Sequence, residues 1–204
     1  MIDFNLQIKT KIYFGPDKED LIGDILSEQR VQRVLIIIGQ GSVKKNGLLT
    51  KVIGKIEEKN ISHMLLEGVR ENIYQIREFK PDFILAIGGG SVIDTAKLIA
   101  CVYDYDGDLF DFNSHKSKPT KALPIGVILT ISAAGSEMST SCVIQNDRTG
   151  RKAGFNSELV RPVFAIENPA LTYSVSPYQT ACGIVDIMMH TLERYMQPSS
   201  ENEP

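Results

Sequence analysis

Apolar runs of strand length alternate with segments of helical periodicity through the first half of the chain. Continuous apolar runs are typical of strands that are covered on both faces, and the helical segments between them supply the cover. The order strand, helix, strand, helix, strand, helix therefore predicts an α/β fold with a parallel sheet and helices on both faces. The strand runs are RVLIIIG (33–39), SHMLLEG (62–68) and DFILAIGGG (82–90), and the helical segments are NGLLTKVIGKIEEKN (46–60), NIYQIREF (72–79) and SVIDTAKLIACVY (91–103).

Three later segments extend this pattern. ALPIGVILT (122–130) predicts a further central strand that ends at Thr130, and TSCVIQNDRTGRKAGF (140–155) predicts two short strands joined through turn residues 147–150. Ser176 as N-cap and Pro177 as first helical residue predict a helix from about 177 to about 195. That helix is apolar nearly all round, as helices buried on several sides are, and no following sequence is available to cover it. We place a domain seam near residue 170.

Composition and charge exclude several classes of function. The chain has 204 residues, 43% of them hydrophobic, which is enough for one substantial core. The formal net charge of −3, with acidic and basic residues interspersed, provides no basic field for nucleic acid or an anionic membrane. No apolar run approaches the roughly 20 residues that span a bilayer. Cys101, Cys142 and Cys182 are odd in number and widely spaced, which indicates reduced, mostly buried thiols. We expect a cytoplasmic protein without nucleic-acid or membrane partners.

A glycine-rich turn lies between a predicted strand and the helix that follows it. Gly88, Gly89, Gly90 and Ser91 let the backbone approach a pyrophosphate, and the positive helix end favours an anion there. A tight strand-to-helix turn without a ligand explains such a sequence about equally well, and the GxGxxG fingerprint is absent.

A second glycine turn, in IIIGQGSVKK, follows the earlier strand. Gly39, Gly41 and Ser42 add a second glycine-bearing strand end to the same sheet, which favours a dinucleotide cleft in a Rossmann-like domain. Residues 39–42 include no acid to bind the ribose hydroxyls of NAD, and Lys44 and Lys45 follow directly. We therefore expect NADP(H) in preference to NAD(H), although a pair of lysines on a helix is more often a solvated face.

Asp186 and His190 are four residues apart on the predicted last helix. At that spacing the two side chains lie on one face, with about 6 Å between their Cβ atoms, which suits a single divalent metal ion. Such sites usually need three or four protein ligands. Glu193 has the spacing of a third ligand, but exposed charge is the preferred interpretation. His63 and His115 lack a partner motif.

Two polar residues of the helix after the first glycine turn have simpler interpretations. Asp94 is expected in the first helical turn, where the helix dipole stabilises a carboxylate without any catalytic role. Lys97 is expected to reach solvent along its aliphatic stem or to pair with a nearby group.

Three ordered motifs, GGGSVIDTAK, LTISAAGSEMS and GIVDIMMHTLERY, resemble the iron-containing (group III) alcohol dehydrogenase family, in its NADPH-dependent butanol dehydrogenase and aldehyde reductase branch. The resemblance runs from KIYFG near the start to ERY at 193–195. Members have an N-terminal dinucleotide-binding α/β domain and a C-terminal all-helical domain, together about twice this length. The resemblance implies a dinucleotide-binding domain over 1–170 and, over 171–204, the truncated start of a metal-binding helical domain.

The resemblance also implies roles for individual residues. Gly89, Gly90 and Ser91 would hold the pyrophosphate of the cofactor. Thr130 and Ile131 would line the cleft near the adenine, and Lys152 would reach a ribose. Ala134 replaces a threonine that relatives use near the cofactor, which puts one hydrogen bond in doubt.

Asp186 and His190 match the first two metal ligands of the family, for Fe²⁺ or Zn²⁺. The other two ligands are histidines of the helical domain, beyond residue 204.

The implied activity is hydride transfer between a nicotinamide and a primary alcohol or aldehyde, with the metal polarising the substrate oxygen. We expect a homodimer, and we expect the chain as given to be incomplete and inactive alone. One alternative is a non-catalytic nucleotide-binding module or one half of a split enzyme. Another is a different member of the dehydroquinate synthase-like superfamily, which shares the GGGS turn.

Overall fold

The computed structural model describes residues 7–39, 41–67, 73–146 and 149–196. Six parallel strands form the main sheet, in the order β1-β8-β5-β4-β2-β3. This confirms the predicted parallel α/β sheet. The strands are β1 (Lys11–Phe14), β2 (Arg33–Ile38), β3 (Ser62–Glu67), β4 (Phe83–Gly88), β5 (Ile125–Leu129) and β8 (Phe164–Glu167).

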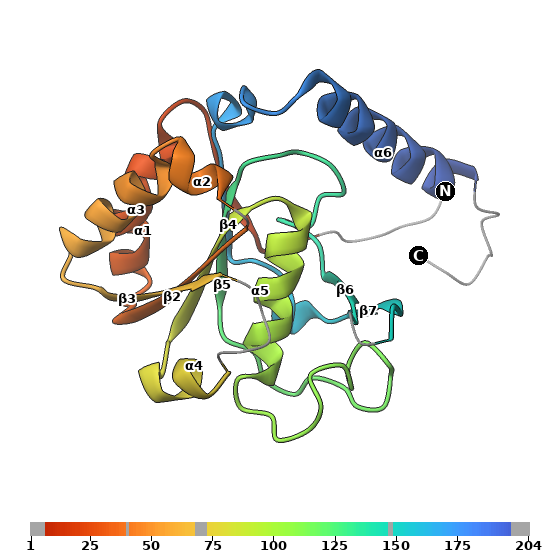
Figure 1. The fold of residues 1–204 in the computed structure, drawn as a ribbon, viewed down its shortest axis with the longest axis horizontal. Coiled ribbons are helices and arrows are strands. Elements are labelled where there is room, and N and C mark those ends of the chain that lie inside the picture. Colours follow the sequence, from red (N-terminus) through yellow and green to blue (C-terminus); the bar gives the residue numbers. More distant parts are fainter. Residues whose placement is uncertain (1–6, 40, 68–72, 147–148, 197–204) are drawn as a thin grey trace.

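Helices cover both faces of this sheet (Figure 1). Side chains along a strand alternate between faces. In β2, Leu35 and Ile37 therefore join the core under α4 (Ile73–Phe79) and α5 (Gly90–Val102). Val34, Ile36 and Ile38 join the opposite core, and β4 divides in the same way. The second core lies under α1 (Ile22–Glu28), α2 (Ser42–Lys45) and α3 (Leu48–Glu57).

A separate antiparallel hairpin packs beside α5. It consists of β6 (Ser141–Gln145) and β7 (Lys152–Asn156), with Cys142 opposite Phe155. Both of these side chains are buried in the core that contains α5. The two predicted short strands are confirmed, while residues 147 and 148 of their turn lie outside the described residues.

The sequence pattern did not reveal two strands or one helix. β1 and β8 are each only four residues long, and β1 is mostly exposed. Neither forms the long apolar run that marks β2 and β4. β8 nevertheless fills the sheet between β1 and β5, with Phe164 stacked on Phe83 at 5.8 Å between ring centroids. The short α1 was missed although its buried Ile22, Ile25 and Leu26 follow the i, i+3, i+4 spacing of an amphipathic helix.

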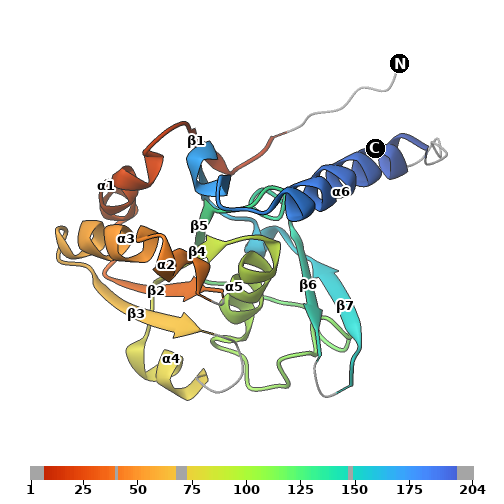
Figure 2. The ribbon, with the colours of Figure 1, turned by 45° about the horizontal axis from the view of Figure 1, so that its top comes forward.

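The last helix, α6 (Pro177–Met196), extends away from the sheet (Figures 1 and 2). Its predicted start is confirmed, since Ser176 Oγ accepts a hydrogen bond from the Gln179 amide at 3.3 Å. Gly183 is its one buried residue among those described. The large apolar and aromatic side chains left exposed on α6 are Tyr178, Ile184, Val185, Ile187, Met188, Met189, Leu192, Tyr195 and Met196.

The cysteines are all free thiols, but they differ in exposure. Cys101 and Cys142 are buried as expected, whereas Cys182 is exposed on α6. Two of the three thiols are therefore buried, which agrees with the expectation of mostly buried thiols. Among the described residues no helix has both the length and the apolar character needed to cross a membrane.

Candidate functional site

The strand order reverses between β2 and β4. The chain leaves β2 for its outer neighbour β3, returns to β4 on the other side of β2, and then continues outward to β5. The carboxyl ends of β2 and β4 are therefore adjacent, with Ile38 paired with Ile87. In open α/β sheets, ligands bind at this switch point, outside the carboxyl ends of the strands. Both predicted glycine turns begin there.

The first glycine turn has no room for a side chain at two of its three glycines, whereas the third faces open space. A Cβ on Gly88 would lie 2.6 Å from Val92 Cγ2, and a Cβ on Gly89 would collide with Ile131. A Cβ on Gly90 would meet nothing within 4 Å. Gly90 is the first residue of α5, so its amide and that of Ser91 have no acceptor within the helix. Open space beside free amides at a helix start suits a phosphate.

A cleft of about 370 Å³ joins the two turns. It brings Gly39, at the end of β2, together with Ser91, on the first turn of α5. A Cβ on Gly39 would lie 3.2 Å from Val92 Cγ2, which shows how closely the second turn approaches α5. A larger cleft, of about 420 Å³, lies beside the C-terminal end of α5 and contains none of the predicted site residues.

The second glycine turn leads into the short helix α2. Gly41 precedes Ser42 with a φ of 87°, a left-handed conformation that favours glycine. Gln40 lies outside the described residues. Lys44 forms an ion pair with Glu67, the last residue of β3, and Glu67 also lines the cleft. Glu67 was not among the predicted site residues, because it follows a different strand from Gly39 and Gly41. The available signal was its place at the end of the neighbouring strand.

Residues 130–140, which we name the β5–β6 loop, lie against the first glycine turn. The Thr130 amide donates a hydrogen bond to the Gly88 carbonyl oxygen at 3.1 Å. Ile131 packs on Gly89, and a Cβ on Gly183 of α6 would lie 2.8 Å from the Ser132 carbonyl oxygen. The loop thus brings Thr130 and Ile131 to the turn and also touches α6, while their place near the adenine stays a prediction from the resemblance.

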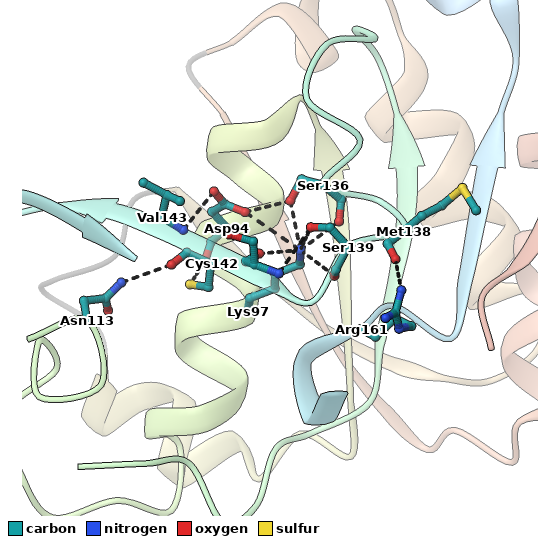
Figure 3. A network of polar contacts seen from close by, with 10 residues as sticks. Asp94, Lys97, Asn113, Ser136, Met138, Ser139, Cys142, Val143 and Arg161 are labelled. Carbon is teal, nitrogen blue, oxygen red and sulfur yellow. Dashed lines mark hydrogen bonds and ion pairs between the residues drawn. The ribbon is translucent and has the colours of Figure 1, made fainter. Parts of the chain in front are cut away.

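Lys97 is fully buried beside this loop (Figure 3). Its Nζ donates to the carbonyl oxygens of Ser136, Ser139 and Ser141 at 2.8, 3.0 and 2.7 Å. The hydroxyls of Ser136 and Ser139 lie at 3.0 and 3.2 Å. Burial lowers the pKa of Lys97 from 10.5 to about 8, against the opposing negative charge of Asp94. The predicted approach of Lys97 to solvent was wrong, and its predicted pairing is with the loop.

Asp94 also differs from its prediction. It is the fifth residue of α5, beyond the first turn. Its Oδ1 accepts a hydrogen bond from Ser136 Oγ at 2.6 Å, and its Oδ2 accepts one from the Val143 amide at 3.1 Å. Asp94 therefore ties α5 to the β5–β6 loop and to β6. Its main partners are these two donors instead of the helix dipole.

Lys152 is the first residue of β7, where it is exposed and paired with Gln145. No described contact joins it to the glycine turns. Its role in a nucleotide site stays a prediction from the resemblance.

Asp186 and His190 come together on α6 as the helical spacing predicted. Asp186 Oδ1 lies 3.6 Å from His190 Nε2, with side chains 46% and 51% exposed. Two donors that each lie about 2.1 Å from one ion are about 3.0–3.4 Å apart, so a small side-chain movement would let this pair share a metal. Among the described residues no group of three or more His, Cys, Asp or Glu side chains is placed to hold a metal. Glu193 is thus not grouped with this pair in the structure.

The fold and the site define a doubly wound α/β domain with open space beside a helix start at its switch point, followed by a helix that presents Asp186 and His190 on one face. Residues 9–169 match the family described as iron-containing alcohol dehydrogenase. The chain therefore belongs to the iron-containing alcohol dehydrogenase family.

Individual relatives agree with this assignment. NADH-dependent butanol dehydrogenase A of Clostridium acetobutylicum is 43% identical over 96% of this chain and 52% of its own length. NADPH-dependent aldehyde reductase YqhD of Escherichia coli is 39% identical over 96% of this chain and 53% of its own. The crystal structure of NADH-dependent butanol dehydrogenase A from Thermotoga maritima superposes with a TM-score of 0.92 at 34% identity, covering 98% of this chain and 52% of that one. The chain thus spans about half the length of the curated relatives it matches.

Proposed function

We propose that this chain is the dinucleotide-binding part of a metal-dependent, NAD(P)-linked alcohol dehydrogenase or aldehyde reductase. The observation that supports the proposal best is the open space at Gly90, beside free amides at the switch point of the sheet. The reaction would be hydride transfer between C4 of the nicotinamide and the carbon of a primary alcohol or aldehyde. The cofactor carries the hydride, while the protein binds, orients and excludes water.

In this proposal the first glycine turn binds the pyrophosphate. The amides of Gly90 and Ser91 donate to phosphate oxygens, and Gly89 lets the backbone approach because it has no side chain. Thr130 and Ile131 form the wall beside the turn, near the adenine. Lys152 would reach a ribose once the cofactor is bound.

The second glycine turn would hold the ribose of the adenosine. Gly39, Gly41 and Ser42 lie at the end of β2, next to Glu67 and the lysines of α2. We propose a preference for NADP(H), because Lys44 and Lys45 together attract a 2′-phosphate more strongly than one carboxylate, Glu67, repels it. The relatives include enzymes named for NADH and others named for NADPH or NADP, so both nucleotides belong in the test.

Asp186 and His190 would hold the metal. Because the family description names iron, we propose iron from the two metals that the sequence suggested. Bound iron would polarise the substrate oxygen as a Lewis acid. The two side chains present one carboxylate oxygen and one imidazole nitrogen from a single helical face, and the remaining ligands would come from outside the described residues.

We propose that the chain alone binds nucleotide but does not reduce aldehydes. NADPH and NADH titrations followed by nicotinamide fluorescence test the first half. Butanal reduction with added Fe²⁺ tests the second, on the chain alone and on a fusion to the second half of the 43% identical Clostridium relative. Activity only in the fusion supports the proposal, and robust turnover by the chain alone contradicts it.

The alternative function is a nucleotide-binding module or one half of a split enzyme. It is favoured by the apolar side chains of α6, which are left exposed in the described part of the chain. Nucleotide binding by the chain without any activity in the fusion would support the module instead.

We also propose a homodimer for the whole protein, which sedimentation of the active fusion would test. The cytoplasmic location stays a prediction.

A further inference from the structure

Lys97 is a buried cation whose hydrogen-bond partners are all neutral. The Asp94 carboxylate lies 4.0 Å from Nζ, beyond hydrogen-bond distance, and it accepts from Ser136 and Val143 instead. The five acceptors of Lys97 come from three serines within a six-residue stretch, 136–141. An ammonium group has three hydrogens, so the five oxygens that surround Nζ share these three donors. This arrangement fixes the path of a segment that has no regular secondary structure.

The β5–β6 loop, which includes Ser136 and Ser139, contacts both halves of the proposed site. At its start, Thr130 is hydrogen-bonded to Gly88, and Ile131 packs on Gly89. At Ser132 it meets Gly183, the one buried residue of α6 among those described. At its far end, Lys97 holds it. Displacement of the held end would therefore be felt at the pyrophosphate turn and at the helix that carries the metal ligands.

We propose that Lys97 is a positioning residue, whose buried ammonium group holds the β5–β6 loop against the glycine turn and thereby sets the affinity for the dinucleotide. This inference rests on the proposed nucleotide binding. It goes beyond that function because the nucleotide affinity would depend on a side chain that does not touch the nucleotide.

The charge state of Lys97 matters to this role. A neutral amine has two hydrogens, and its lone pair would face carbonyl oxygens, so the loop loses donors when the proton leaves. Charged or titratable groups face Lys97 from each element packed on it: Asp94 on α5, Glu137 in the loop, Cys142 on β6 and Arg161 after the 3-10 helix Glu158–Val160. Because burial lowers the pKa to about 8, the ammonium form dominates below pH 8 and is lost above it.

The first experiment compares Lys97→Met with the wild-type chain and with Lys55→Met as matched control. Lys55 lies on α3 and pairs only with Glu58 among the described contacts. Circular dichroism and thermal unfolding first establish that each variant is folded. NADPH and NADH are then titrated at pH 7. We expect Lys97→Met to reduce the affinity for the more tightly bound nucleotide by about tenfold or more. A loss of this size is expected when hydrogen bonds to a charged group are removed. Lys55→Met should stay within about twofold.

The second experiment separates positioning from a general structural role. The wild-type dissociation constant is measured from pH 7 to pH 9.5, where the 2′-phosphate of NADPH is already ionised. It should rise above pH 8, whereas that of Lys97→Met should not change with pH. Hydrogen exchange at pH 7 should be faster for amides 130–141 in Lys97→Met than in wild type, and unchanged in Lys55→Met.

The outcomes distinguish this inference from the proposed function. A wild-type chain that binds neither nucleotide contradicts the function and this inference with it. Wild-type binding that Lys97→Met retains in full, with no pH dependence, overturns the inference alone. If Lys97→Met does not fold, the wild-type pH profile decides, because a flat profile overturns the positioning role.

Discussion

Asp186 Oδ1 and His190 Nε2 face each other across 3.6 Å on one turn of α6, in a part of the helix that nothing described covers. The pair is pre-arranged by helical spacing alone, because residues four apart share a face. Half-exposed side chains with two donors make a weak site, since divalent metals in proteins usually take three or four protein ligands.

Metal binding by the chain alone should therefore be weak and should depend on both residues. We expect Asp186→Asn and His190→Ala each to reduce Fe²⁺ affinity by about tenfold or more, the scale seen when a group that supports a metal site is lost. Glu193→Gln, on the same helix, serves as control and should leave the Fe²⁺ affinity unchanged. Anaerobic calorimetry measures the affinities. Equal binding by all four proteins would place the metal elsewhere.

The two neighbouring glycines should respond differently to alanine. At Gly90 there is room for a methyl group, so Gly90→Ala should change the free energy of unfolding by less than about 0.5 kcal/mol yet weaken nucleotide binding, because the methyl occupies the phosphate opening. At Gly89 a methyl group meets Ile131, so Gly89→Ala should cost roughly 1–3 kcal/mol by overpacking. Urea unfolding and NADPH titration measure both effects. Gly54→Ala, in open space on α3, is the control.

The ion pair of Lys44 and Glu67 should influence cofactor choice. Glu67→Gln removes the negative charge beside the cleft and frees Lys44 for a 2′-phosphate. We expect the ratio of NADPH to NADH affinity to rise by about fivefold to tenfold, equivalent to about 1 kcal/mol for a partly exposed charge. Glu58→Gln, on α3 away from the cleft, should leave the ratio unchanged. A fall of the ratio in Glu67→Gln would show that the carboxylate does not oppose the phosphate.

The three thiols should differ in reactivity. Burial raises the pKa of Cys101 to about 12, and burial also raises the pKa of Cys142, so neither forms appreciable thiolate at pH 8. Cys182 is exposed on α6. Iodoacetamide at pH 8 should modify Cys182 alone in the folded chain, as read by peptide mass spectrometry. In Cys182→Ser the folded chain should take no label, and after denaturation both remaining cysteines should react. Rapid labelling of Cys142 in the native protein would contradict the packing of β6 on α5.

Much of the fold follows from short-range signals in the chain. The apolar runs of β2 and β4, the glycines after them, and the Ser176–Pro177 start of α6 depend on residues that are close in sequence. β1 and β8 were missed because each has only four residues, and because their pairing, with Lys11 opposite Phe164, joins the two ends of the domain. No local pattern reports a contact over such a separation.

The candidate site likewise has some features that the sequence reveals and others that only the folded structure shows. The glycine turns and the Asp186–His190 pair are local motifs, and the chain sequence alone was sufficient to find them. The burial of Lys97 and the approach of Glu67 to Lys44 were not visible there, since their partners lie 39 to 44 and 23 residues away in the sequence. Backbone periodicity and turn chemistry act between neighbours, whereas burial and charge pairing depend on which distant segments the folded sheet brings together.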